Sequence, residues 1–142
     1  MSKPKFELRF DQDAYKEYER LDNSVAKIVD DFFEELEIRA DEIGKALTNK
    51  QSTKLHGCKE IKLKKAGIRI VFRLTNETVD ILQIVYILTI EKRQDGIVFK
   101  LADKRLRRFK AKSNLREHLE QARTWNKTEH GRQKDKPNHP KT

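Results

Sequence analysis

Two consecutive segments in the middle of the chain alternate in polarity: charged residues alternate with apolar ones over residues 59–64, and in residues 68–74 the face opposite the apolar one carries Arg69, Val71 and Arg73. Alternation of charged and apolar residues with a period of two indicates half-buried β-strands whose charged side chains share one face. A face with several fixed cations and few carboxylates suits a polyanionic partner, although Lys and Arg also commonly occupy the solvated side of a strand. The charged positions are Glu60, Lys62, Lys64, Arg69 and Arg73.

Other common catalytic and metal-binding motifs are not expected in this chain. The sequence has no glycine-rich phosphate loop followed by Lys and then Ser or Thr. His56 and Cys58 are close in sequence, but no pair of cysteines has ligand spacing, so we expect no metal site. Cys58 begins a strand-like segment, where a lone cysteine is usually packed rather than nucleophilic. We therefore expect no metal and no cofactor.

The charge of the 142-residue chain, +9 in total, is unevenly distributed along the sequence. Residues 1–53 carry a net charge of −4, whereas residues 54–106 carry +6 and residues 107–142 carry +7. A chain with basic charge held in one part favours a nucleic-acid partner over a merely soluble surface.

Three sequence features favour a cytoplasmic protein with no membrane association. No apolar run approaches the roughly 18 residues of a membrane span. The first residues lack the apolar stretch of a signal peptide. The single Cys58 cannot form an internal disulfide, which agrees with a reducing compartment.

Hydrophobic periodicity predicts the elements that position the charged face. An alternating strand is expected over residues 5–10, and then Asp11 caps a helix over about 12–21. Asn23 or Ser24 is expected to cap a second helix that runs to about residue 40, so the two helices form a hairpin. Residues 41–57 show no sustained period and predict a loop.

The second half of the chain predicts three strands and then helices. Turns are expected at residues 65–67 and 75–78, and the apolar run 79–90 is typical of a buried central strand. Helices are expected over about 95–110 and again over 113–124, whereas residues 126–142 have no apolar side chain and predict disorder. The fold class is therefore α+β: an N-terminal strand and a helical hairpin packed on a roughly four-stranded, largely antiparallel sheet, with a C-terminal helix.

Several segments, in order, resemble RelE/ParE toxins. Those that resemble the central hairpin of these toxins are Leu55-His56-Gly57, Ile61-Lys62-Leu63 and Gly67-Ile68-Arg69-Ile70-Val71-Phe72. Those that resemble the last strand and C-terminal helix are Glu91-Lys92-Arg93-Gln94, Val98-Phe99 and Ala102-Asp103-Lys104-Arg105-Leu106. The resemblance covers about residues 5–106. It implies a RelE-like toxin domain over residues 1–110, followed by a basic extension over 111–142 that is partly helical and then disordered.

The resemblance also implies an activity. RelE toxins of type II toxin–antitoxin systems are endoribonucleases (mRNA interferases) that cleave messenger RNA in the ribosomal A site. The ribose 2′-OH attacks the adjacent phosphate, and no metal is needed. By position, Lys62 matches a general base, Arg69 an arginine that stabilises the transition state, Arg93 the proposed proton donor and Phe99 a tyrosine that stacks on a base. Because an arginine pKa lies above 12, Arg93 is better suited to charge stabilisation. The other RNA-binding candidates are Lys59, Lys64, Arg73 and Lys92.

Two departures from the family pattern leave alternatives open. Glu60 stands where the family has a second lysine, and Lys59, one residue earlier, would face the other side of the strand unless a bulge turns it. Either Lys62 or Glu60 is therefore the candidate base. Phe99 keeps the stacking surface but lacks the hydroxyl.

Two other functions fit the same sequence. A ParE-like toxin shares the fold and inhibits DNA gyrase, but lacks the cationic set. A basic module that binds nucleic acid without catalysis is the second alternative. The resemblance to RelE toxins implies three partners: a cognate antitoxin protein, the ribosome and messenger RNA.

Overall fold

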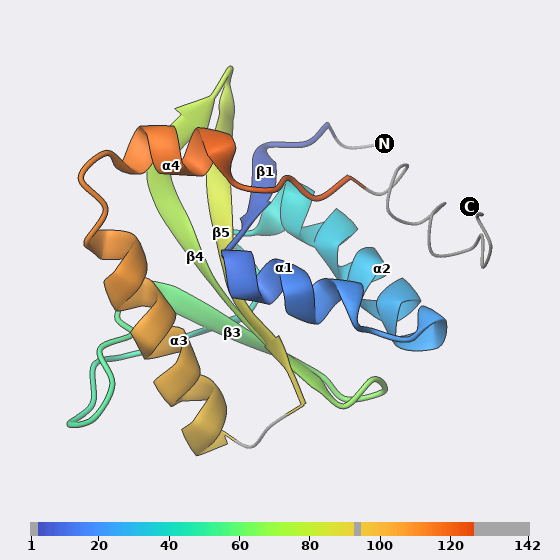
Figure 1. The fold of residues 1–142 in the computed structure, drawn as a ribbon. Coiled ribbons are helices and arrows are strands. Elements are labelled where there is room, and N and C mark those ends of the chain that lie inside the picture. Colours follow the sequence, from blue (N-terminus) through green and yellow to red (C-terminus); the bar gives the residue numbers. More distant parts are fainter. Residues whose placement is uncertain (1–2, 93–94, 127–142) are drawn as a thin grey trace.

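A computed structural model describes residues 3–92 and 95–126 of the chain (Figure 1). The strands are β1 (Phe6–Phe10), β2 (Lys45–Ala46), β3 (Cys58–Leu63), β4 (Ile68–Val79) and β5 (Leu82–Glu91). The helices are α1 (Gln12–Glu19), α2 (Asn23–Arg39), α3 (Asp95–Lys110) and α4 (Leu115–Gln121). One five-stranded sheet has the order β1-β5-β4-β3-β2, with β1 parallel to β5 and the other neighbours antiparallel. The predicted α+β class is confirmed.

Apolar side chains cover both faces of this sheet. Alternate residues of β4 and β5, such as Ile70 and Val85, join β1, α1 and α2 in one buried cluster. The intervening residues, such as Val71 and Tyr86, join α3 and α4 in a second cluster on the opposite face. The dense apolar run of the central strand is explained by this arrangement, since a strand covered on both sides needs apolar residues at consecutive positions.

The N-terminal helices begin where side chains cap their free backbone amides. The carboxylate of Asp11 accepts hydrogen bonds from the backbone N–H groups of Asp13 (2.8 Å) and Ala14 (3.2 Å), as predicted. The second cap is Asp22, which accepts from Val25 N at 3.0 Å, so the prediction of Asn23 or Ser24 was wrong by one or two positions.

The turn expected at residues 75–78 was wrong, because β4 runs through these polar residues to Val79. The side chain of Thr75 donates to Ile84 O at 2.8 Å, across an irregularity in the ladder between Leu74 and Thr78. The chain instead reverses at Asp80, whose φ of 54° lies in the left-handed region. A further difference is β2, which lies in the expected loop and raises the number of strands to five.

The described part of the C-terminal extension, residues 111–126, packs into the fold: α4 joins the second cluster through Leu119, and the residues after it reach β1 and the first cluster. Trp125 is 3% exposed and belongs to the cluster under α1 and α2. Thr124 forms an antiparallel bridge with Arg9 of β1. The guanidinium of Arg9 donates to Leu119 O and Ala122 O at 3.0 and 3.1 Å, at the negative end of α4. The disorder predicted for residues 126–142 falls almost wholly outside the described residues.

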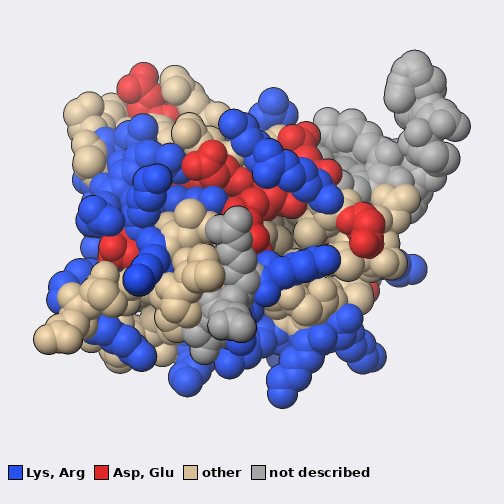
Figure 2. Space-filling model, turned by 60° about the horizontal axis from the view of Figure 1, so that its bottom comes forward, with Lys and Arg blue, Asp and Glu red and all other residues tan. Residues whose placement is uncertain are grey.

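Lys and Arg side chains cover much of one end of the molecule. Figure 2 looks onto the lower end of the fold of Figure 1, where α3 begins and the β3–β4 turn lies. Lys and Arg side chains gather at the upper left of this view and along its lower edge, and most of the visible Asp and Glu side chains form one patch near and above its centre.

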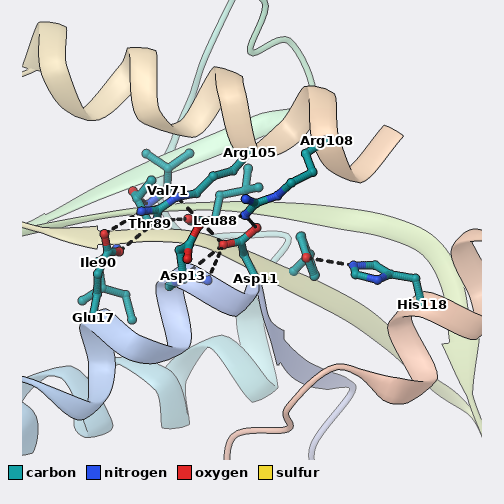
Figure 3. A network of polar contacts seen from close by, with 12 residues as sticks. Asp11, Asp13, Glu17, Val71, Leu88, Thr89, Ile90, Arg105, Arg108 and His118 are labelled. Atoms are coloured by element: carbon teal, nitrogen blue, oxygen red, sulfur yellow. Dashed lines mark hydrogen bonds and ion pairs between the residues drawn. The ribbon is translucent and has the colours of Figure 1, made fainter. Parts of the chain in front are cut away.

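A buried ionic network fixes α3 beside α1 (Figure 3). The ladder between β1 and β5 ends at the pair Phe10 and Ile87, and beyond it Glu17 of α1 accepts a hydrogen bond from Ile90 N at 3.0 Å. The same carboxylate receives two hydrogen bonds from Arg105 of α3, at 2.8 and 2.9 Å. Arg105 also donates to Leu88 O at 2.8 Å. The network thus ties the sheet and both helices together.

Candidate functional site

Two basic residues lie directly opposite each other on β3 and β4. Lys62 and Arg69 are paired across the antiparallel ladder, so their side chains project from the same face of the sheet. The sequence prediction that they share a face is confirmed. Lys62 is exposed, whereas the side chain of Arg69 is only 25% exposed. The pair therefore combines a solvent-exposed ammonium with a guanidinium held close to the sheet.

Glu60 holds Arg69 in this position. The Glu60 side chain lies two residues before Lys62 on the same face and is only 5% exposed. Arg69 Nη1 donates to Glu60 Oε2 at 3.3 Å. A buried carboxylate is costly unless it is paired, so this contact stabilises both side chains in one arrangement.

Lys62 stands between two surface hollows. The larger, of about 350 Å³, is bordered by Lys62, Lys64, Arg69 and Lys92, with Gly67 beside them at the β3–β4 turn. The smaller, of about 280 Å³, lies toward β2 and is bordered by Glu60, Lys62, Phe99 and residues of the 45–55 segment. Five of the predicted site residues besides Glu60 thus border two neighbouring hollows that share Lys62: Lys62, Lys64, Arg69, Lys92 and Phe99.

The hollows are strongly electropositive. Among the residues that border them, Glu60 is the one carboxylate, and it is already paired with Arg69. The basic side chains around them are Lys45, Lys50, Lys62, Lys64, Lys92 and Arg69. Such a set attracts polyanions and stabilises negative charge that develops on a bound phosphate.

Other predicted residues lie elsewhere. Lys59 projects from the opposite face of β3, and its Nζ donates to Ala40 O at 3.2 Å, at the end of α2. The β3–β4 pairing is continuous from Cys58 to Leu63, so no bulge brings Lys59 back to the site face. The structure therefore separates Lys59 from Lys62.

Arg73 lies at the far end of the site face. It follows Arg69 by four residues, about 13 Å along a strand. Its Nη1 donates to His56 O at 3.1 Å, over Gly57, where a Cβ atom would come within 2.5 Å of that nitrogen. This packing gives Arg73 a structural partner away from the hollows. Arg93 lies outside the described residues.

Sequence reasoning missed Lys45 and Lys50. Lys45 is paired with Glu60 across β2 and β3, and both lysines border the smaller hollow. They lie in the segment with no sustained period, so the sequence contained no pattern that could place them.

Two other kinds of site, a metal centre and a cysteine nucleophile, are disfavoured among the described residues. Among residues 3–92 and 95–126, no group of three or more His, Cys, Asp or Glu side chains could hold a metal ion. Burial raises the pKa of the Cys58 thiol above its usual value, which disfavours a thiolate nucleophile. Within the same residues, no helix is both long and apolar enough to cross a bilayer.

Comparisons with known proteins point to one family. The chain is 28% identical, over 108 residues, to an Escherichia coli protein whose name assigns it provisionally as a RelE-like toxin. The match covers 72% of this chain and 99% of that protein. No protein-family model matches the chain.

Solved structures give the same likeness. The free state of a double arginine-to-alanine mutant of Escherichia coli toxin RelE superimposes with a TM-score of 0.55 at 26% identity, over 73% of this chain and 99% of that one. The isolated Escherichia coli RelE toxin has a TM-score of 0.46 at 26% identity, over 71% of this chain and 98% of that chain.

Proposed function

Since the chain is RelE-like in both sequence and fold, we propose that it is the toxin of a type II toxin–antitoxin system and an endoribonuclease that cleaves messenger RNA on the ribosome. The observation that carries the proposal is the Lys62–Arg69 pair, which stands at the edge of an electropositive hollow open to solvent. A gyrase inhibitor of the ParE type would not need this pair.

The larger hollow is proposed to receive the scissile phosphate. Its cations, Arg69, Lys64 and Lys92, would neutralise the phosphate and stabilise the charge that builds on its oxygens in the transition state. The ribose 2′-oxygen gives its proton to the base and bonds to phosphorus, and the bond from phosphorus to the 5′-oxygen breaks. The leaving 5′-oxygen takes a proton from water, so the products are a cyclic phosphate and a free 5′-hydroxyl. Arg93 is proposed to add charge stabilisation at the leaving oxygen.

Lys62 is the better proposed base. A general base must reach the 2′-hydroxyl and accept its proton. Lys62 in its neutral form meets these needs because it is exposed and borders the hollow. Glu60 is buried and already bonded to Arg69, so its carboxylate is less accessible to a ribose hydroxyl than the exposed Lys62. We therefore assign Glu60 to positioning Arg69.

The partners follow from the same proposal. Messenger RNA and the ribosome would bind the electropositive face in the cytoplasm. A cognate antitoxin would inhibit the toxin by covering this face with an acidic or amphipathic segment, in competition with RNA. The remaining predicted contacts of Lys59 and Arg73 with RNA are not part of the proposed site, because their side chains lie away from both hollows.

Primer extension on a defined messenger tests the proposal. The full chain is added to translating ribosomes and, in parallel, to the same messenger without ribosomes. Cuts that appear only with ribosomes support the RelE-type activity. A protein that cuts nothing but inhibits gyrase would be ParE-like, and one that only binds RNA would be a non-catalytic module. Either result would refute the proposed reaction.

A further inference from the structure

We propose that the outer face of α3 and the loop beside it form a further RNA-binding surface, which holds the sugar–phosphate backbone of the messenger outside the two hollows. The inference rests on the proposed function, which supplies messenger RNA as the ligand, but the surface takes no part in the cleavage step. The α3 surface consists of five exposed cations: Lys50, Lys54, Lys100, Lys104 and Arg107.

Three of these cations form a row along the outer face of α3. Lys100, Lys104 and Arg107 are four and then three residues apart, so they follow one another at one per helical turn, about 5.4 Å along the axis. All three side chains are exposed, that of Arg107 by 71%. A straight row of cations with this spacing suits successive phosphates of one extended nucleic-acid strand.

Buried contacts hold the row in place. The inner face of α3 packs into the second hydrophobic cluster through residues that include Val98 and Ala102. Arg105, which lies between Lys104 and Arg107 in the sequence, makes two hydrogen bonds to Glu17 in the buried ionic network. The cations therefore stand on a fixed helix, so a bound strand needs little ordering of the protein backbone.

The loop between β2 and β3 adds two cations beside the row. The carboxylate of Asp103, which is 7% exposed, accepts from Lys54 N at 2.8 Å and from Arg107 Nε at 3.1 Å. The loop is closed by Lys50 N, which donates to Thr53 O at 2.7 Å. Asp103 is the only carboxylate among the side chains of α3 that the structure describes, and it serves to hold the loop next to the row.

The α3 surface is continuous with the proposed cleavage site. Lys50 borders the smaller hollow, and so does Phe99, which directly precedes Lys100 on α3. Lys and Arg side chains gather at the upper left of Figure 2, on the side of the molecule that α3 occupies in Figure 1. A messenger strand that leaves the hollows on this side would pass directly onto the row.

The composition of the surface favours RNA over an acidic protein segment. The core of a protein–protein interface is enriched in aromatic side chains and depleted of lysine. Four of the five cations here are lysines, and the one large apolar side chain exposed on the described part of α3 is Ile97. Such a surface suits a ligand that carries one negative charge in every repeating unit.

The length of the bound RNA tests the surface without cleavage and without ribosomes. The full chain is titrated with 2′-O-methyl oligonucleotides of about four and ten nucleotides, in which no 2′-hydroxyl can attack, and binding is followed by fluorescence anisotropy. We expect the longer strand to bind about 10-fold more tightly, because it reaches the row as well as the hollows.

A triple variant, Lys100→Ala with Lys104→Ala and Arg107→Ala, should remove this advantage. The affinity for the longer strand should fall about 10-fold, and its salt slope should fall by about 2, at about 0.7 for each phosphate contact. The affinity for the shorter strand should change less than about 2-fold. The double variant Lys100→Ala with Lys104→Ala keeps the Asp103–Arg107 pair intact and should show about two-thirds of the change in slope.

A charge-matched control lies on the other side of the sheet. Lys16→Ala with Arg20→Ala and Lys27→Ala removes the same charge from exposed positions of the α1–α2 hairpin and should leave both affinities unchanged. Equal losses for the two lengths in the α3 variant, or the same losses in this control, would overturn the inference, because net charge alone would then explain the binding. A polyglutamate peptide that binds more tightly than the longer strand, and is lost in the α3 variant, would also overturn it in favour of a protein partner.

The outcomes separate this inference from the proposed function. Length-dependent binding that requires the row, in a protein that cleaves no messenger, would support the α3 surface and refute the proposed function. Ribosome-dependent cleavage by a protein whose binding does not depend on RNA length would have the opposite meaning.

Discussion

At the residue scale, the face on which a side chain lies decides which chemistry is open to it. Lys59 and Lys62 belong to the same strand and have the same side chain, yet one bonds the end of α2 and the other borders both hollows. The two lysines therefore form a matched pair for experiment.

Lys62→Ala is expected to lower the rate of messenger cleavage about 100- to 1,000-fold, whereas Lys59→Ala should lower it less than about 3-fold. The reason is that, of these two lysines, Lys62 alone borders the larger hollow and can reach a phosphate or ribose there. Cleavage rates on translating ribosomes, measured by quantitative primer extension, check this. Equal losses in the two variants would mean that catalysis does not depend on the site face.

Glu60→Gln distinguishes a base from a positioning residue. An amide at this position can still accept a hydrogen bond from Arg69, so we expect cleavage to fall by less than about 10-fold, with the pH dependence of the rate unchanged. The rate is measured between pH 5.5 and 8.5. If the rate fell by about 1,000-fold and no longer changed with pH on the acidic side of the profile, Glu60 would be the base.

At the element scale, periodicity predicted most helices and strands because each has a regular apolar face. It predicted the shared face of Lys62 and Arg69 for the same reason. It failed at residues 75–78, where polar residues suggested a turn but an irregular strand continues, and at β2, which is held by pairing with β3 rather than by its own pattern. Pairing between distant segments produces no regular pattern within either segment, so the position of Lys45 could not be predicted from the sequence.

The ionic network between α1 and α3 predicts a large difference between two arginines of one helix. Arg105→Ala should lower the free energy of unfolding by about 3–5 kcal/mol, because it leaves Glu17 buried and unpaired. Arg107→Ala is the control: the Arg107 side chain is 71% exposed, and loss of its pair with Asp103 should cost below about 1 kcal/mol. Urea denaturation followed by circular dichroism measures both. Similar costs would mean that the network does not hold α3.

Glu37 of α2 predicts how stability changes with pH. Burial, with the neighbouring Glu34 and Glu7 carboxylates, raises the pKa of Glu37 from 4.5 to about 7. The folded state therefore binds this proton more tightly than the unfolded state, and the stability gained below pH 4.5 is lost as pH rises through 7. Because the side chain is half-buried, we expect Glu37→Gln to raise stability at pH 8 by about 1 kcal/mol, with little change at pH 4.5.

Urea denaturation of both proteins at pH 4.5, 6 and 8 checks this, and the difference between them cancels the titration of other groups. A constant difference across the three pH values would show that Glu37 titrates normally in the folded protein.

At the scale of the whole molecule, the C-terminal part of the chain consists of two segments with different expected roles, residues 111–126 and residues 127–142. Residues 111–126 complete the fold through Leu119, Thr124 and Trp125. Residues 127–142 hold five Lys or Arg and two Asp or Glu and contain no apolar side chain. The first segment is expected to supply stability, and the second is expected to supply charge.

Two truncations separate these roles. A chain that ends at Lys110 loses the buried Trp125, whose removal alone should cost about 3–5 kcal/mol, so we expect it to be largely unfolded. A chain that ends at Asn126 should unfold at the same temperature as the full protein, within about 2 °C. Thermal unfolding followed by circular dichroism distinguishes the two. A stable chain ending at Lys110 would mean that α4 and Trp125 add little to the core.

The chain ending at Asn126 also tests how charge contributes to binding. Each phosphate neutralised by Lys or Arg releases counterions, so the logarithm of affinity falls with the logarithm of salt concentration by about 0.7–0.9 per contact. If residues 127–142 contact ribosomal RNA, removing their five cations should reduce this slope by about 1 to 4 while the cut sites stay the same. The affinity for ribosomes is measured at salt concentrations between about 50 and 200 mM, a range in which such slopes are resolved. An unchanged slope would mean that the basic surface around Lys62 provides the electrostatic attachment and that residues 127–142 form a solvated extension.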